Sequence, residues 1–275
     1  MTRKRASYCC QLVFRKGGRG LKQAISKSIS FLFACVFVYA CANLIQIGYD
    51  YWNNRTVLAE AQQLYERSNR PTARQGKEGT ALQDLQQSAF SGLHAINDDI
   101  VGWIFIGGTN IDYPVLQGHD NEYYLNRNYK GEETRAGSIF MDYRNHIGGE
   151  ERNRILYGHR MKDSSMFSDL TAFTDQSFFY NQPDMFYDTT DAQYDIEVFS
   201  VYQTKTDFYY IETDFQSDDA YEAFLTDIQE RSLFQAETEV TVNDQIITLS
   251  TCDYRLHPTE GRLVVHGKLI ERSSG

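Results

Sequence analysis

An unbroken run of 19 uncharged residues, Ile29–Ile47 (ISFLFACVFVYACANLIQI), most constrains what this chain of 275 residues can fold into. A helix needs about 20 predominantly apolar residues to cross the hydrocarbon core of a bilayer. The run therefore predicts one membrane-spanning helix. A short segment precedes it, and the residues that follow are numerous enough for one sizeable domain.

Charge is distributed unevenly about this run. Eight of the 27 Lys and Arg residues lie within residues 1–28, whereas all 37 Asp and Glu residues lie at or beyond Asp50. By the positive-inside rule, we expect the basic segment to stay in the cytoplasm and the acidic remainder to lie outside the cell. Tyr49, Tyr51 and Trp52 follow the run, where amphipathic rings suit the membrane interface.

A cleaved signal peptide is the alternative to an uncleaved anchor. The run is long for the apolar part of a signal peptide, and it shows no A-x-A-like cleavage site. The sequence VYAC, ending at Cys41, resembles a lipoprotein cleavage box only loosely, because Tyr39 is too bulky for its place. We therefore expect a single-pass protein of the cell membrane. Its predicted parts are a cytoplasmic basic arm (1–28), a transmembrane anchor (29–48), a helical stalk or packing region (49–96) and an exported domain (97–275).

Two stretches after the anchor have the spacing of helices. Apolar residues recur on one face of 55–68 and again in 80–96, and a polar stretch at 69–79 with one proline and two glycines separates them. Each helix either forms a solvated stalk or packs on the exported domain. For the second we expect at least partial packing.

From Asn97 onward the pattern changes to short strands separated by turns. Eight stretches have strand composition: 101–106, 110–116, 137–143, 153–159, 194–204, 207–211, 245–252 and 262–270. Ser217, followed by two acidic residues, has the pattern of a helix N-cap and predicts one helix at 217–232. The exported domain is therefore expected to be mainly β, a closed or nearly closed barrel of eight strands.

Cysteine usage isolates one thiol. Four of the five cysteines lie in the basic arm or the apolar run, and only Cys252 falls in the exported domain, where it has no partner for a disulfide. A lone thiol there is either buried and inert or functional. Cys252 ends an apolar strand, and Arg262 begins the next strand ten residues later. If those strands pair, the guanidinium faces the thiol, where it favours the thiolate and can stabilise an oxyanion. The alternative for Arg262 is a surface arginine at a strand end.

Acyl transfer at a cysteine also needs a proton donor, for which histidine is the usual side chain. The sequence offers His94, His119, His146, His159, His257 and His266. Spacing favours His159, because it ends an apolar strand just before an irregular polar segment. His257, in the loop after Cys252, is the main alternative.

Four motifs carry a family resemblance. LSTC at 249–252, followed ten residues on by Arg262, resembles the Cys-to-Arg segment of the sortases, and YGH at 157–159 resembles their histidine segment. Residues 100–129 and 137–145 resemble the early strands of class B sortases, which are membrane-anchored cysteine transpeptidases of Gram-positive bacteria. The resemblance covers roughly residues 97–270, and its motifs occur in the order expected for the family.

The resemblance implies both a fold and a site. The fold is an eight-stranded sortase-type β-barrel with N-terminal helices and a helix between strands six and seven. It implies Cys252 as the nucleophile, His159 as the general acid and base, and Arg262 as the oxyanion and substrate-positioning group. Ser250 and Thr251 are the implied substrate-binding residues. Asp253 follows the cysteine directly, where this sequence departs from some members of the class, and whether an acidic residue assists His159 stays open.

The resemblance also implies a reaction. Sortases cut a C-terminal sorting signal after a threonine, form a thioester and transfer the acyl group to an amine. The implied partners are surface proteins that carry sorting signals, with an amine of a peptidoglycan precursor or a pilin lysine as the acceptor. No cofactor, metal or nucleic acid is expected, since the acidic calcium-site pattern of class A sortases is not evident. The alternatives are a hydrolytic cysteine protease on the same scaffold and a non-enzymatic, surface-anchored binding module.

Overall fold

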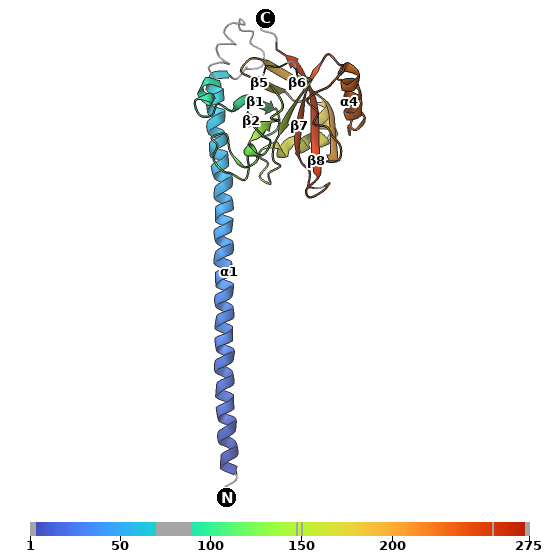
Figure 1. Cartoon of the computed structure of the whole chain (residues 1–275). Coiled ribbons are helices and arrows are strands. Elements are labelled where there is room, and N and C mark those ends of the chain that lie inside the picture. Colours follow the sequence, from blue (N-terminus) through green and yellow to red (C-terminus); the bar gives the residue numbers. More distant parts are fainter. Residues whose placement is uncertain (1–3, 70–89, 147, 150, 255, 273–275) are drawn as a thin grey trace. The chain divides into compact units, whose positions relative to one another are not determined.

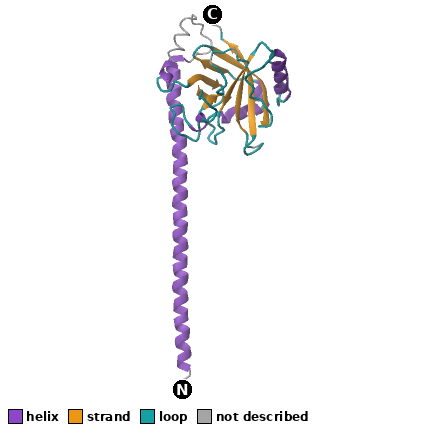
Figure 2. Ribbon diagram, in the orientation of Figure 1, coloured by secondary structure: helices purple, strands orange, loops and turns teal. Residues whose placement is uncertain are grey.

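Eight strands form a closed barrel. The computed structural model describes residues 4–69, 90–146, 148–149, 151–254 and 256–272. The strands pair in the order β1-β2-β3-β4-β7-β8-β6-β5, and β5 pairs again with β1. Figure 1 labels most of these strands along the chain, and Figure 2 colours the strands of the barrel orange. The strands are β1 (Ile100–Ile106), β2 (Asp112–Leu116), β3 (Ile139–Met141), β4 (Asn153–Tyr157), β5 (Met185–Thr189), β6 (Gln193–Lys205), β7 (Gln245–Cys252) and β8 (Gly261–Glu271). The predicted mainly β barrel is confirmed.

Strand direction brings distant segments of the chain to one rim of the barrel. β4 and β7 are parallel neighbours, with Tyr157 opposite Ser250 near their ends. β8 is antiparallel to β7, so it begins where β7 ends. The residues that follow β4, end β7 and begin β8 therefore lie together at this rim. These are the three segments on which the sequence places its candidate catalytic residues.

The barrel interior is filled by alternating apolar side chains, as a small barrel requires. The interior cluster includes Ile104, Val115, Ile139, Leu156, Tyr187, Val198, Ile247 and Val265. A short 3-10 helix η2 (Phe167–Thr174) and helix α3 (Gln176–Tyr180) follow β4, and the buried Phe167, Leu170 and Phe173 of η2 add to this core. A second 3-10 helix, η1 (Tyr123–Asn126), lies between β2 and β3.

Helix α4 (Asp218–Glu230) covers the outside of β6 and β8. The Ser217 hydroxyl caps it by accepting a hydrogen bond from the Ala220 amide at 3.1 Å, so the predicted N-cap is confirmed. Tyr221, Leu225 and Ile228 on α4 form a cluster with outward-facing side chains of β6. For this reason the middle of β6 is buried on both faces.

Two details of the predicted strand pattern are wrong. Residues 207–211 have strand composition but form an irregular segment, and β5 was not expected. The two errors offset each other, so the strand count stays at eight and α4 still lies between β6 and β7. The strand predicted at 207–211 does not form. The carbonyl oxygens of Ile211 and of the adjacent Glu212 accept hydrogen bonds from the side chains of Arg144 and Asn153, and not from a neighbouring strand.

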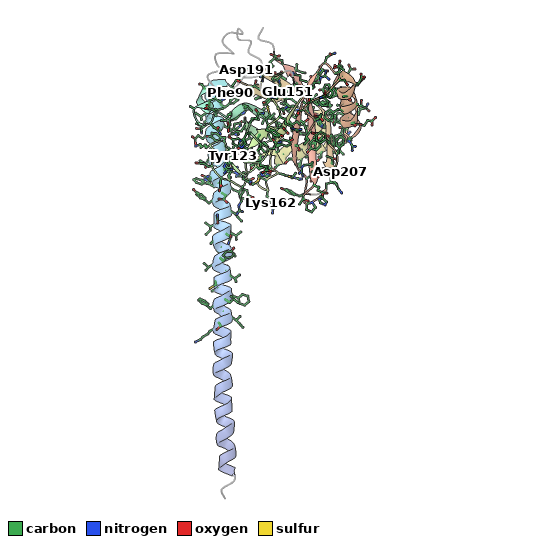
Figure 3. All side chains as sticks on the ribbon, in the orientation of Figure 1. Phe90, Tyr123, Glu151, Lys162, Asp191 and Asp207 are labelled. Carbon is green, nitrogen blue, oxygen red and sulfur yellow. The ribbon has the colours of Figure 1, made fainter. Side chains whose placement is uncertain are left out.

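The predicted anchor at 29–48 and the predicted helix at 55–68 are parts of one continuous helix, α1 (Lys4–Asn69). The stretch contains no proline, and the helix ends two residues before Pro71. Within α1, Lys27–Tyr65 is a candidate membrane span with a mean hydropathy of 2.1 in its most apolar window. The side chains of this window are exposed along the helix (Figure 3).

The chain divides into two compact units, Met1–Trp52 and Asn53–Gly275. Within the second unit, the last turns of α1 pack on the barrel. The Tyr65 ring stacks on Trp103 with centroids 4.2 Å apart, and its hydroxyl donates a hydrogen bond to the buried Asp188 at 2.5 Å. Phe90 and Leu93, in a helical turn at 90–94, join the same cluster (Phe90 is labelled in Figure 3). These residues therefore pack on the barrel and do not form a free stalk. Residues 70–89, which hold most of the predicted loop at 69–79 and the first part of the predicted helix at 80–96, lie outside the described part of the chain.

Candidate functional site

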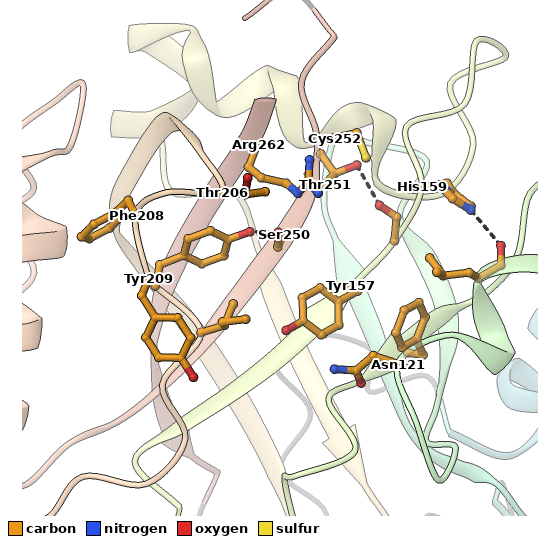
Figure 4. Close-up of a pocket in the computed structure, with 15 residues that line it drawn as sticks. Asn121, Tyr157, His159, Thr206, Phe208, Tyr209, Ser250, Thr251, Cys252 and Arg262 are labelled. Carbon is orange, nitrogen blue, oxygen red and sulfur yellow. Dashed lines mark hydrogen bonds between the residues drawn. The ribbon is translucent and has the colours of Figure 1, made fainter. Parts of the chain in front are cut away.

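A pocket of about 280 Å³ opens at the rim where β4 and β7 end and β8 begins. It is lined by Asn121, Leu125, Phe140, Tyr157, Gly158, His159, Thr206, Phe208, Tyr209, Tyr210, Ile211, Ser250, Thr251, Cys252 and Arg262. In Figure 4, Arg262, Cys252 and His159 lie along one side of the pocket, and Tyr209, Tyr157 and Asn121 lie along the other. The three predicted catalytic residues therefore share one pocket.

Cys252 and Arg262 are direct neighbours across two strands. The register of β7 and β8 pairs Cys252 with Arg262, so the predicted pairing is confirmed. Cys252 is partly exposed and its side chain lines the pocket, which does not fit a buried, inert cysteine. A guanidinium beside a partly exposed thiol is the environment that favours the reactive thiolate.

The Arg262 guanidinium is held by its own loop. Its Nη1 donates hydrogen bonds to the carbonyl oxygens of Thr259 at 3.0 Å and Gly261 at 2.9 Å. Burial raises the pKa of the neighbouring Tyr210 hydroxyl, although the Ser250 hydroxyl and the Arg262 charge both act to lower it. The positive charge of Arg262 thus acts on a hydroxyl that lines the pocket.

His159 is oriented by a backbone carbonyl. Its Nε2 lies 2.7 Å from the Leu125 carbonyl oxygen (Figure 4). A carbonyl can only accept, so Nε2 carries a hydrogen and donates it, and Nδ1 is the nitrogen left for proton transfer. The backbone carbonyl of His159 accepts a hydrogen bond from the Phe167 amide at 3.0 Å, which fixes the backbone just after β4.

A buried ion pair links the residues next to His159 and Cys252. Arg160 donates to the carboxylate of Asp253 at 2.8 Å, and Gln203 from β6 donates to its second oxygen. Asp253 is buried and faces Arg160 rather than His159. Among the described contacts, the orienting group on the His159 ring is therefore a carbonyl, and the acid next to the cysteine holds two segments of the site together.

Ser250 and Thr251 both line the pocket and are both buried. The Ser250 hydroxyl lies 2.7 Å from the Tyr210 hydroxyl, and the Thr251 hydroxyl donates to the Gly158 carbonyl at 2.8 Å. The Thr251 bond joins β7 to the residue before His159. Their predicted contact with substrate stays a prediction.

The other histidines lie away from the pocket lining. The His257 ring accepts hydrogen bonds from backbone amides of its own loop, at Glu260 (3.1 Å) and Thr259 (3.4 Å). His266 is fully buried between Tyr202 and Thr248. The remaining three lie elsewhere: His94 contacts the Ile100 carbonyl, His119 lies near Asp120, and His146 pairs with Glu151.

The aromatic wall of the pocket, at residues 208–210, is not predicted from the sequence. Phe208, Tyr209 and Tyr210 line the pocket, yet their composition predicted a strand. Leu125 contributes through its carbonyl, which no side-chain pattern can reveal. Tyr157, the first residue of the YGH motif, is the one sequence signal that could indicate an aromatic lining. Within the described residues, no group of three or more His, Cys, Asp or Glu side chains is arranged to hold a metal ion.

Comparison with known proteins gives consistent matches. The family model described as the sortase domain matches residues 104–270. Sortase B of Listeria monocytogenes is 40% identical over 252 residues, which cover 92% of this chain and 99% of the relative.

Solved structures agree. The crystal structure of sortase B from Bacillus anthracis in complex with AAEK1 matches with a TM-score of 0.70 and 53% identity, covering 82% of this chain and 99% of that one. A Staphylococcus aureus sortase B–substrate complex matches with a TM-score of 0.72 and 37% identity, covering 82% of this chain and 100% of that one. These similarities extend over the whole barrel.

Proposed function

This chain belongs to the sortase family, and within it to class B, and we propose that its reaction takes place at Cys252, with His159 and Arg262 as the other two catalytic residues. The chain is a cysteine transpeptidase that anchors surface proteins. One observation carries the assignment of residues: Cys252 pairs directly with Arg262, and both share a single pocket with His159.

The first half of the proposed reaction is acylation of the enzyme. The Cys252 thiolate attacks the carbonyl carbon of the scissile peptide bond, and the guanidinium of Arg262 stabilises the oxyanion that forms. The intermediate collapses when His159, as the imidazolium, donates the proton on Nδ1 to the leaving amine. A thioester on Cys252 and a neutral His159 remain. The Leu125 carbonyl keeps the ring oriented throughout, because it holds the other nitrogen.

The second half transfers the acyl group. An incoming amine attacks the thioester carbonyl, and Nδ1 of the neutral His159 accepts the proton that the amine loses. Collapse of the second tetrahedral intermediate expels the Cys252 thiolate and forms the new amide. Arg262 stabilises the oxyanion in both halves. The enzyme returns to its starting state with thiolate and imidazolium restored.

The peptide substrate is proposed to occupy the pocket. The surface of its lining is mostly apolar and includes five aromatic side chains, which suits an extended peptide segment and limits access of water to the thioester. Ser250 and Thr251 are proposed to contact the residues that precede the scissile bond. The substrates are then C-terminal sorting signals of surface proteins.

The acceptor and the location follow from the same proposal. The acceptor is an amine of a peptidoglycan precursor or of a pilin lysine. Both lie outside the membrane, and we propose that the barrel lies there too, with the apolar part of α1 as a single-pass anchor and the N-terminus in the cytoplasm. The uneven distribution of charge and the apolar helix support this proposal. No cofactor is assigned to the reaction.

One experiment tests the assignment. The full chain in detergent is incubated with fluorescent sorting-signal peptides, with and without added triglycine or lysine amines, and the products and any adduct on Cys252 are identified by mass spectrometry. We expect a thioester at Cys252 and an amine-containing product, both lost in Cys252→Ala. Cleavage that never incorporates the amine would support the hydrolytic alternative. Full activity of Cys252→Ala would refute the proposal.

A further inference from the structure

We propose that Arg144, clamped by the buried carboxylate of Asp142, is a positioning residue that fixes the pocket wall at residues 208–211 and so determines how tightly the peptide substrate binds. The inference rests on the proposed function of the pocket. Arg144 and Asp142 do not line the pocket themselves, and they act through residues that do.

The wall needs such support because it is not a strand. Residues 208–211 supply four of the pocket-lining side chains, yet they form an irregular segment between β6 and α4. Backbone groups that leave the sheet must find other partners. Here Arg144 donates to the Ile211 carbonyl at 2.9 Å and to the Tyr209 hydroxyl at 3.0 Å, and Asn153 donates to the Glu212 carbonyl at 2.9 Å.

The carboxylate of Asp142 that binds Arg144 also accepts hydrogen bonds from residues on the opposite side of the pocket. The Asp142 side chain is fully buried. One oxygen accepts hydrogen bonds from the Tyr157 hydroxyl at 2.8 Å and the Asn121 side-chain amide at 3.0 Å. Tyr157 and Asn121 both line the pocket (Figure 4). The Asp142–Arg144 pair therefore connects three segments of the pocket: the end of β4, the segment before η1 and the wall at 208–211.

The geometry requires an arginine. Nε and Nη2 of Arg144 each donate to Asp142 at 2.8 Å, and Nη1 and Nη2 together supply the bonds to Tyr209 and Ile211. The planar fork directs these hydrogens to both sides at once. A lysine ammonium keeps the charge but cannot reproduce that arrangement.

The charge on Asp142 is maintained despite its burial. Burial alone would raise the pKa of Asp142, but hydrogen bonds from Arg144, Tyr157 and Asn121 outweigh it and hold the pKa below its ordinary value. The carboxylate thus stays ionised at neutral pH. A permanently charged pair with good geometry gives the wall one defined position.

The test compares two arginines of similar exposure. Arg144 and Arg152 have side chains that are 28% and 30% exposed, and each pairs with an aspartate, but Arg152 pairs with Asp218 outside the pocket. Arg144→Lys and the control Arg152→Lys are prepared in the full chain. We measure kcat and KM for a sorting-signal peptide and the rate at which iodoacetamide alkylates Cys252.

We expect Arg144→Lys to raise KM about tenfold, the size of a charged hydrogen bond lost, with kcat and the alkylation rate within about twofold of the wild type. Arg152→Lys should leave all three unchanged. Tyr209→Phe removes one hydroxyl from an exposed side chain and should raise KM about threefold, with no further effect in the Arg144→Lys background. This variant keeps the test decisive if Arg144→Lys does not fold.

Two outcomes would overturn the inference. An unchanged KM in both Arg144→Lys and Tyr209→Phe would show that the pair does not set substrate binding. Equal losses of kcat and of the alkylation rate would show general damage to the site. Neither result tests whether Cys252 is the nucleophile, because failure of the proposed function would appear separately, as activity that survives Cys252→Ala.

Discussion

Arg160 donates a hydrogen bond to Asp253 at 2.8 Å, and each of these residues directly follows a proposed catalytic residue, His159 in one case and Cys252 in the other. The Asp253 side chain is 1% exposed and that of Arg160 is 16% exposed, so the pair is largely removed from water. Since β4 and β7 are held together by their ladder only as far as Tyr157 and Ser250, the ion pair extends the connection past the ends of the paired region.

The first prediction concerns this pair. Asp253→Asn keeps the shape of the side chain but removes the charge, which should lower the free energy of unfolding by about 1–3 kcal/mol. It should also lower kcat by about tenfold, because small displacements of reacting groups are costly. Urea denaturation and steady-state kinetics measure the two effects. Asp218→Asn, in an exposed pair with Arg152, is the control, and equally small changes in both variants would count against a positioning role.

The second prediction separates the two proposed roles of Arg262, stabilising the oxyanion and favouring the thiolate. Arg262→Gln should lower kcat by about 100- to 1,000-fold, as expected for loss of an oxyanion donor. Arg262→Lys keeps the positive charge beside Cys252 and should retain the iodoacetamide reactivity of the thiol while recovering only part of kcat. The alkylation rate and kcat are measured on both variants. A lysine variant with full kcat would show that charge alone is sufficient.

The third prediction uses the buried His266. Burial lowers its pKa to about 3, so the folded protein keeps this ring neutral. In the unfolded chain His266 binds a proton when the pH falls below its ordinary pKa of 6.5. Its contribution to the free energy of unfolding is therefore fully present above pH 6.5 and is lost as the pH falls toward 3. Between pH 7 and pH 4 the loss amounts to roughly 3 kcal/mol.

His266→Gln has no proton to gain and should lack that loss. The difference in unfolding free energy between wild type and variant should therefore shrink by the same amount on going from pH 7 to pH 4. Urea denaturation at several pH values measures it. A difference that stays constant with pH would mean that His266 titrates normally in the folded state.

The fourth prediction concerns the contact of α1 with the barrel. Burial raises the pKa of Asp188 to about 6, although Arg272 and the Tyr65 hydroxyl act to lower it. The folded state thus holds this proton more tightly than the unfolded chain, so the contribution of Asp188 to stability falls as pH rises from about 4 to about 6.

Tyr65→Phe removes a donor that matters most when Asp188 is ionised. It should destabilise the barrel by about 1–3 kcal/mol at pH 7.5 and by less at pH 4.5. Thermal unfolding of the full chain in detergent at the two pH values measures this. A penalty that is larger at the lower pH would contradict the hydrogen bond to a carboxylate.

Much of the fold followed from residue patterns. Strand periodicity and turn residues located seven of the eight strands, and Ser217 with its acidic neighbours located α4. Cys252 and Arg262 lie ten residues apart on consecutive predicted strands, so they face each other if those strands pair, and the register of β7 and β8 meets that condition. Local patterns succeed where the hydrogen-bond partners are themselves local or strand-to-strand.

Prediction failed where the partners are distant side chains or carbonyls. The segment 207–211 has the composition of a strand, but acceptors in and next to it are bound by Arg144 and Asn153, which lie more than 50 residues earlier in the chain. His159 was favoured on spacing, yet the carbonyl that orients it belongs to Leu125. Neither contact leaves a trace in the residue types nearby. Residue types near the site therefore do not predict these contacts, which form only when the barrel brings the distant segments together.

The bond from His159 Nε2 to Leu125 has a kinetic consequence. In the proposed reaction, with that nitrogen occupied, one atom, Nδ1, serves the departing amine and then the arriving one. Both amines have to approach the same edge of the ring, and the two cannot be there together. The first product must leave before the acceptor enters, so the enzyme should follow ping-pong kinetics, and an excess of either amine should compete with the other for a single place.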